Sequence, residues 1–263
     1  MLFTVDISNS HITLGVFQKN GTGFCDLPSF TARMVTDRQR TGDQYACELM
    51  QLLVLHHTAP EEIQDVMICS VVPELTYAFQ SAVKQLTGIT PLVLGPGVKT
   101  GLPIIIDNPA QLGSDLVAGA VAAAHLYPKP CAILDLGTAT TISVLDAQGK
   151  FRGGMICAGI TVTLESLASR TSLLPHVNVE CPKTAIGTNT IHSMQSGVVY
   201  GTAAMIDGMI DRIEEELGQS VTAVATGQLS HVVVPACRKP VQICEHLLLT
   251  GLRLIYEKNQ KQK

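Results

Sequence analysis

The sequence contains no tryptophan and few other aromatic residues. Its 263 residues include five tyrosines and six phenylalanines, and the formal net charge is −4. Proteins that bind nucleic acid usually present a basic face, and those that hold single strands add aromatic side chains on which bases stack. This sequence has neither feature, so we expect no nucleic-acid partner.

Long hydrophobic runs and paired cysteine motifs are also missing. No apolar run approaches the roughly 20 residues of a membrane helix. The first residues, MLFTVDIS, lack the basic start and the small-residue cleavage site of a signal peptide. The eight cysteines show no CxxC motif and no Cys/His metal spacing, a pattern typical of free thiols in a reducing cytoplasm. We therefore expect a cytoplasmic protein without a membrane span.

Apolar residues are plentiful, and their pattern restarts halfway along the chain. Hydrophobic residues make up 46% of the sequence and charged residues 15%, which is ample for a large core. Their spacing predicts strands followed by helices, and then the same order again. The predicted strands are 3–5, 12–17, 29–35, 66–69, 92–94, 132–134, 140–145, 151–156 and 221–225. The predicted helices are 43–56, 73–87, 108–125, 190–217 and 245–257.

Two segments with the same design stand at the start of the two halves. Residues 4–17 read TVDISNSHITLGVF and residues 131–145 read CAILDLGTATTISVL, so that Asp6 aligns with Asp135. A carboxylate at the end of an apolar strand is costly unless it is hydrogen-bonded, paired or bound to a metal. The small polar residues after it allow backbone N–H groups and hydroxyls to approach a ligand, as in a phosphate-binding loop with a cation nearby.

A simpler interpretation exists for one such segment, namely a hairpin with an aspartate in its turn. Its occurrence at matching places in both halves favours a functional role instead. The repeat also favours two α/β halves over a single α+β domain, which could give the same run of elements. We predict an N-terminal half at residues 1–112 and a C-terminal half at residues 113–263.

Ordered motifs along the whole chain resemble the type III pantothenate kinases, within the acetate and sugar kinase/Hsc70/actin superfamily. The resemblance implies two duplicated ribonuclease H-like halves, each a mixed β-sheet flanked by helices, with the active site in the cleft between them. The matching segments are VDISNSHITLGVF (5–17), CSVVPELTYAF (69–79), GPGVKTGLP (95–103), DNPAQLGSDLVAGAVAA (107–123), LDLGTATTISVLDAQGKFRGGMICAGI (134–160), IGTNTIHSMQSGVVYG (186–201), VATGQL (224–229) and LTGLRLIYEKN (249–259).

The resemblance implies an ATP-dependent kinase that converts pantothenate to 4'-phosphopantothenate, the first step of coenzyme A biosynthesis. It further implies that Asp6 holds Mg²⁺ and that Asp135 binds a monovalent cation, K⁺ or NH₄⁺. The residues implied to contact ATP are Asp6, Ser8, Asn9, Ser10, His11, Thr13 and Thr138.

Asp115 is implied to be the general base. Phosphorylation of a primary alcohol needs positioning, charge neutralisation and a carboxylate that accepts the hydroxyl proton. Taken alone, Asp115 is better interpreted as an acidic residue favoured by the dipole of a helix N-terminus. The residues implied to contact pantothenate are Gly113, Ser114, Asp115, Leu116, Thr190 and Ile106.

The family forms homodimers, so we expect a homodimer whose contact uses small residues on the helix predicted at 190–217. Gly197 and Gly201 are four residues apart on that helix. Packing within one chain is the simpler use of such residues, whereas two-fold symmetry is the common default for oligomers.

Four positions depart from the family pattern. Ser8 replaces a glycine of the first loop, Leu116 replaces an arginine after the base, Ile106 stands where many members have tyrosine, and Gln228 replaces a second glycine. If position 8 required a positive φ, Ser8 would cost about 1 kcal/mol. The departures leave two alternatives open. One is a weakened or inactive member that serves as a ligand-sensing or regulatory protein, and the other is a kinase of another small alcohol.

Overall fold

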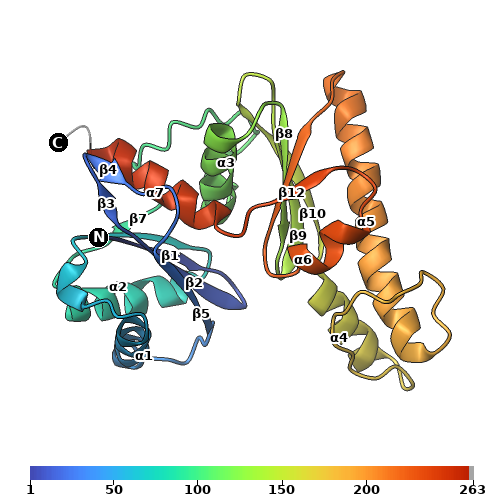
Figure 1. Ribbon diagram of the computed structural model, residues 1–263, viewed down its shortest axis with the longest axis horizontal. Helices are drawn as coiled ribbons and strands as arrows, with labels where there is room; N and C mark the ends of the chain where they lie inside the picture. The colour runs from blue at the N-terminus through green and yellow to red at the C-terminus, as the bar shows by residue number, and fades with distance from the viewer. Residues whose placement is uncertain (261–263) are drawn as a thin grey trace. The chain divides into compact units, whose positions relative to one another are not determined.

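The computed structural model describes residues 1–260, which fold into two compact units (Figure 1). The first unit comprises Met1–Leu102, Ala110–Ala122 and residues 246–260. The second comprises Pro103–Pro109 and Ala123–Glu245. The chain thus returns to its first unit at the end, because the last helix packs on the first sheet. This grouping by contacts differs from the predicted division at residue 112. That division concerns the two repeated halves of the sequence and stays a prediction.

The sheet of the first unit has five strands in the order β5-β2-β1-β6-β7. Strands β1 (Leu2–Ile7), β2 (His11–Phe17) and β5 (Phe30–Val35) are antiparallel, and β6 (Asp65–Ser70) and β7 (Leu92–Val93) join β1 in parallel. All residues of β1 are buried, as expected of a central strand covered on both faces. The hairpin of β3 (Lys19–Asn20) and β4 (Gly23–Phe24) stands apart from this sheet.

Helices cover both faces of this first sheet. Phe3, Val5 and Ile7 join one core with α1 (Gly42–Leu55) and α2 (Pro73–Thr87), whereas α7 (Leu247–Gln260) contacts β1, β2 and β6. Helix α2 begins with Pro73 and ends at Gly88, which has a left-handed backbone conformation. Helix α3 (Ser114–Leu126) begins in this unit and ends in the second, and the short 3₁₀ helices are η1 (Pro60–Glu62) and η2 (Pro109–Gln111).

The sheet of the second unit repeats this plan in the order β10-β9-β8-β11-β12. Strands β8 (Cys131–Leu136), β9 (Ala139–Leu145) and β10 (Phe151–Ala158) are antiparallel, and β11 (Thr222–Thr226) and β12 (Val241–Ile243) are parallel to β8. Helix α5 (Thr190–Leu217) and helix α4 (Ile160–Arg170) supply apolar side chains to the core on one face of this sheet. Helix α6 (Ser230–Val233) and η3 (Val234–Ala236) complete the unit.

The registers of the two sheets confirm the predicted duplication. Asp6 is opposite Thr13 on β2 and beside Cys69 on β6. Asp135 is opposite Thr141 on β9 and beside Thr226 on β11. Each aspartate is the second-last residue of the central strand, so the two segments aligned by sequence occupy equivalent places.

Four elements of the second unit were not predicted, namely helices α4 and α6, the 3₁₀ helix η3 and strand β12. Most other elements match their predicted ranges within a few residues. Within residues 1–260, no helix is both long and apolar enough to span a bilayer.

Candidate functional site

The loop between β1 and β2 gathers the first group of predicted site residues. The backbone N–H of Ser8 donates to the carbonyl of His11 at 3.0 Å and closes the turn. The segment after β5 forms two hydrogen bonds to this loop. Thr36 Oγ1 donates to the carbonyl of Ser8 at 2.7 Å, and Arg38 donates to Asn9 Oδ1 at 3.0 Å. Thr13 follows on β2 opposite Asp6. Burial and the charge of Arg33 lower the pKa of His11, which favours a neutral ring at neutral pH.

Ser8 fits its position without backbone strain. Within residues 1–260, His57 is the one non-glycine residue with a positive φ, so position 8 does not require glycine. The hydroxyl of Ser8 donates to Asp6 Oδ2 at 3.0 Å. The departure from the family pattern therefore adds an oriented hydrogen bond to a carboxylate that is only 5% exposed.

The first turn of α3 is fastened to the end of β6, the strand next to Asp6. Ser114 Oγ donates to the carbonyl of Ser70 at 3.0 Å and accepts a hydrogen bond from Cys69 Sγ at 3.1 Å. Cys69 is paired with Asp6 across the parallel ladder, so both side chains project from the same face of the sheet. Asp6, Cys69 and Ser114 thus form one cluster within the first unit.

Asp115 follows directly, and its half-buried carboxylate folds back on its own helix start. Its Oδ1 accepts a hydrogen bond from the N–H of Leu116 at 2.8 Å. A β-carbon on Gly113 would lie 2.4 Å from the same oxygen, so a larger residue there would displace the Asp115 carboxylate from this position. Burial raises the pKa of Asp115, and the N–H bond opposes this only in part. A carboxylate with a raised pKa at a helix start is suited to accept a proton.

The second loop, residues 137–139, is enclosed by glycines that approach its backbone closely. A β-carbon on Gly159 would lie 2.3 Å from the carbonyl oxygen of Thr138. A β-carbon on Gly227 would lie 2.8 Å from Asp135 Oδ1, and Gly227 has a φ of 91°. Gly159 of the GGMICAGI segment and Gly227 of the ATGQ segment are therefore required for steric reasons. A side chain at either position would displace the backbone or carboxylate of the second loop.

The surroundings of Asp135 offer oxygen donors to a cation. Thr141 Oγ1, directly across the ladder, is buried and has no hydrogen-bond partner in the protein. A hydroxyl oxygen beside a carboxylate is a hard oxygen donor, the type that alkali and alkaline-earth cations prefer. The donor set at this position thus fits a cation, whereas no cluster of three or more His, Cys, Asp or Glu side chains suited to a metal occurs within residues 1–260.

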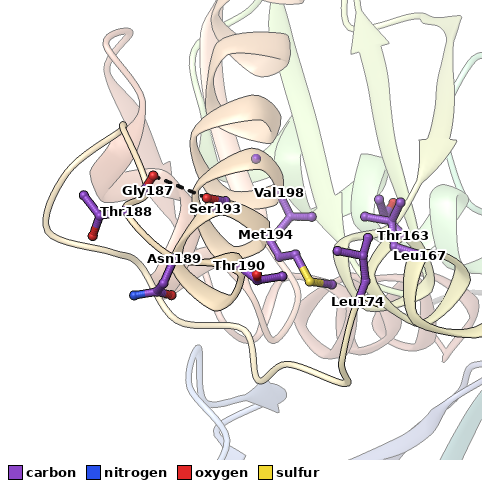
Figure 2. Close-up of a pocket in the computed structure, with 11 residues that line it drawn as sticks. Thr163, Leu167, Leu174, Gly187, Thr188, Asn189, Thr190, Ser193, Met194 and Val198 are labelled. Carbon is purple, nitrogen blue, oxygen red and sulfur yellow. Dashed lines mark hydrogen bonds between the residues drawn. The ribbon is translucent and has the colours of Figure 1, made fainter. Parts of the chain in front are cut away.

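Thr190 lines a cavity of about 670 Å³ in the second unit (Figure 2). Asn189 caps the helix, because its side chain accepts a hydrogen bond from the N–H of His192 at 2.9 Å. Figure 2 shows the side chain of Met194 extending toward Leu174, opposite the hydroxyl-bearing residues of the loop. The volume is typical of a site for a small organic molecule. The lining residues are Thr163, Leu167, Leu174, Gly187, Thr188, Asn189, Thr190, Ser193, Met194, Gly197 and Val198.

Two further departures lie in the second unit. Ile106 is half-buried and faces Gly153, whose added β-carbon would lie 3.9 Å from Ile106 Cγ2. Gln228 is exposed and follows the left-handed Gly227. Position 228 itself has no positive φ, so its backbone accepts a side chain.

Sequence analysis singled out Asp6, Ser114 and Asp115 but missed the residues that support them. Cys69 and Ser70 lie in the quoted CSVVPELTYAF segment, and Thr141 ends the quoted run LDLGTATT. Their roles depend on which strands are neighbours, and the parallel pairing of β1 with β6 joins residues about 60 positions apart. The internal repeat could have identified them, because β6 lies beside β1 in the first sheet as β11 lies beside β8 in the second.

The chain matches known proteins over nearly its whole length. The profile of the type III pantothenate kinase family matches residues 2–212. A type III pantothenate kinase from Myxococcus xanthus is 38% identical over 259 residues, which cover 98% of this chain and 99% of the relative. One from Koribacter versatilis is 37% identical and covers 99% of this chain and 96% of its own.

Solved structures resemble this one in fold. A Campylobacter jejuni protein assigned to the Baf family of transcriptional activators superposes with a TM-score of 0.58 at 17% identity, covering 98% of this chain and 99% of its own. The activator of 2-hydroxyisocaproyl-CoA dehydratase from Clostridium difficile, with bound ADPNP, gives a TM-score of 0.52 at 14% identity, covering 99% and 98%. These likenesses confirm the predicted actin-like fold class.

Family profile, relatives and fold agree with the arrangement of carboxylates and loops described above. The chain belongs to the type III pantothenate kinases, the ATP-using enzymes that phosphorylate pantothenate in coenzyme A biosynthesis.

Proposed function

We propose that Asp115 is the general base in the transfer of the γ-phosphoryl group of ATP to pantothenate. Its carboxylate would accept the proton of the primary hydroxyl while that oxygen bonds to phosphorus and the bond to ADP breaks. The observation that carries the proposal is the raised pKa of a half-buried Asp115 carboxylate fixed at the start of α3. The product would be 4'-phosphopantothenate.

We assign ATP phosphates and Mg²⁺ to the loop after β1. Backbone and hydroxyl groups of Ser8, Asn9, Ser10, His11 and Thr13 would contact ATP, and Thr138 would do so from the second loop. When bound, Mg²⁺ supplies charge neutralisation on the phosphates, and one carboxylate suffices because the ion keeps several waters. Asp6 is suited to hold it, since Ser8 fixes its Oδ2.

Asp135 would bind K⁺ or NH₄⁺. The buried and unsatisfied Thr141 Oγ1 beside it supports this assignment, because a bound cation would satisfy that oxygen. Gly227 leaves room for the Asp135 carboxylate where any other residue would crowd it.

Pantothenate would contact Thr190, Ile106 and the helix-start segment Gly113, Ser114, Asp115 and Leu116. The cavity at Thr190 combines apolar side chains with hydroxyls, which suits a molecule that carries a dimethyl group, hydroxyls, an amide and a carboxylate. Leu116 cannot supply the charge of the arginine that the family pattern has there. We therefore expect a higher pantothenate KM than in members with the arginine.

We further propose a homodimer in the cytoplasm. The exposed apolar side chains Ile156, Leu173 and Ile186 in the second unit support a contact surface, since each is more than 75% exposed. All eight cysteines are free, as is usual in a reducing compartment.

The test is ADP release by the purified protein at millimolar ATP with Mg²⁺, K⁺ and pantothenate, against omission of each component in turn. Mass spectrometry should detect 4'-phosphopantothenate only in the complete mixture. Replacement of K⁺ by Na⁺ should lower turnover if Asp135 holds the cation. A folded protein that binds ATP or pantothenate without turnover would contradict the proposal and support a ligand-sensing role.

A further inference from the structure

Cys69 occupies a fully buried position between two carboxylates with proposed roles. It is the second-last residue of β6, its side chain is 0% exposed, and it pairs with Asp6 on the neighbouring strand. On its other side lies Ser114, the first residue of α3, followed by Asp115. The one thiol thus contacts the strand that carries Asp6 and the helix that carries Asp115.

The hydrogen bonds around the thiol form a chain. Cys69 Sγ donates to Ser114 Oγ at 3.1 Å, and Ser114 Oγ in turn donates to the carbonyl of Ser70 at 3.0 Å. The serine hydroxyl has one proton, which the Ser70 carbonyl takes, so the acceptor position faces Cys69. The first turn of α3 is therefore held by two consecutive residues of β6.

The thiol is suited to remain a donor. Its side chain is fully buried, so water does not compete for the S–H, and oxidants in solution do not reach the sulfur. The residue is thus suited to positioning rather than to covalent chemistry.

We propose that Cys69 is a positioning residue that fixes the first turn of α3, and with it Asp115, relative to the strand of Asp6. The inference rests on the proposed role of Asp115 as base. Small displacements of a catalytic group lower kcat without weakening ATP binding, because positioning matters most in the transition state.

The test compares Cys69→Ala, which removes the donor, with Cys69→Ser, which keeps one. Cys131→Ala is the matched control, because Cys131 is a buried free cysteine at the start of β8, away from the proposed site residues. Cys69→Ala should lower kcat about three- to tenfold with little change in the ATP KM. Cys69→Ser should restore most of the activity, and Cys131→Ala should keep it.

A double-mutant cycle asks whether Cys69 acts through Ser114. If it does, Cys69→Ala in a Ser114→Ala background should add less to the loss of kcat than it does alone. Full additivity, or a kcat of Cys69→Ala equal to that of the unmodified protein, would overturn the proposal. So would a loss in Cys69→Ser as large as in Cys69→Ala.

Amide hydrogen exchange supplies a readout that does not need turnover. The N–H groups of Leu116 and Val117, which bond to Asp115 Oδ1 and to the Gly113 carbonyl, should exchange faster in Cys69→Ala than in Cys69→Ser. Unchanged exchange would contradict the inference. If the unmodified protein shows no turnover while Cys69→Ala still shows the faster exchange, the proposed role of Asp115 as base is contradicted and the positioning role of Cys69 is not. Should Cys69→Ala not fold, Ser114→Ala must show the same faster exchange, and its absence would overturn the inference.

Discussion

At the scale of single residues, each proposed catalytic carboxylate is held by a short hydrogen-bonding contact. Asp6 accepts a hydrogen bond from the hydroxyl of Ser8, and Asp115 accepts one from the backbone N–H of Leu116. Both are shielded from water, which costs free energy in the ionised form. Such costs are commonly retained where function requires them, so substitution at these residues should separate activity from stability.

Asp115→Asn should remove nearly all turnover and stabilise the fold. Loss of a general base typically lowers kcat by about 10²–10⁴. Because the pKa of Asp115 is raised in the folded state, ionisation at neutral pH opposes folding, and the neutral amide removes that cost while its oxygen can still accept the Leu116 N–H. Thermal melts at pH 7 should show a higher Tm, and full activity would disprove the base assignment.

The pH dependence of stability and of kcat/KM should both reflect the raised pKa of Asp115. Since the native state holds the Asp115 proton more tightly than the unfolded chain does, its contribution to stability falls as pH rises through the raised pKa. Turnover should do the opposite and rise through that pKa, because the base must be ionised. A log plot of kcat/KM against pH should therefore show an acid limb above the ordinary aspartate value, and this limb should vanish from the residual activity of Asp115→Asn.

Ser8→Ala should weaken catalysis with ATP although the backbone tolerates it. The variant loses the hydrogen bond to Asp6, worth about 0.5–1.5 kcal/mol, or about a two- to twelvefold loss in kcat/KM for ATP. Ser166→Ala, an exposed residue of α4, is the control. Ser8→Gly should not improve on the unmodified protein, since position 8 has no positive φ. A gain in Ser8→Gly would show that the family glycine serves the ligand and not the backbone.

At the scale of elements, sequence patterns predicted the strands and long helices but not every piece of the second unit. Helix α4 was missed because its first turn, Ile160 to Thr163, is rich in β-branched residues that favour strands. Leu164 and Leu167 continue the helical spacing from Ile160, yet short amphipathic segments are ambiguous. Strand β12 has only three residues, too few for a periodic signal.

Gly159→Ala should damage the loop at residues 137–139. The added β-carbon would lie 2.3 Å from one carbonyl oxygen and 2.5 Å from another, both of backbone, so neither can rotate away. Overpacking of this kind costs about 1–3 kcal/mol or more, and we expect a lower Tm and a loss of K⁺ dependence. Gly95→Ala is the control because nothing lies within 4 Å of its β-carbon. Equal melting temperatures for the two variants would contradict the steric argument.

At the scale of the whole molecule, the repeat predicted the two sheets, and the family resemblance indicated the candidate site residues, which stay predictions. Cys69 and Thr141 were not predicted as site residues, because they are brought to the aspartates by pairing between strands. The spacing of residues along the chain does not encode that pairing. Ser8 was recognised as a departure, but whether it strains the backbone depends on φ, which the sequence alone does not determine. The assignments to Mg²⁺, K⁺ and pantothenate remain predictions for solution experiments.

Gly201→Ala should report on the proposed dimer. Within the chain, nothing lies within 4 Å of a β-carbon at Gly197 or Gly201, and alanine favours a helix over glycine by about 1 kcal/mol. If α5 packs closely against a second copy, the methyl group should instead weaken the dimer about tenfold or more. Sedimentation equilibrium measures the dissociation constant. A raised Tm with unchanged association would place the contact elsewhere.

The glycines around the second loop also restrict how the protein can evolve. At Gly159 and Gly227 a β-carbon would collide with backbone atoms of residues 136–138, so neither position has a neighbouring substitution that costs little. Gly95, Gly197 and Gly201 have open space around a β-carbon and no positive φ. Drift should therefore be slow at the first pair, whatever alcohol a descendant phosphorylates, and distant descendants should still be recognisable by those two positions after their substrate-contacting residues have diverged.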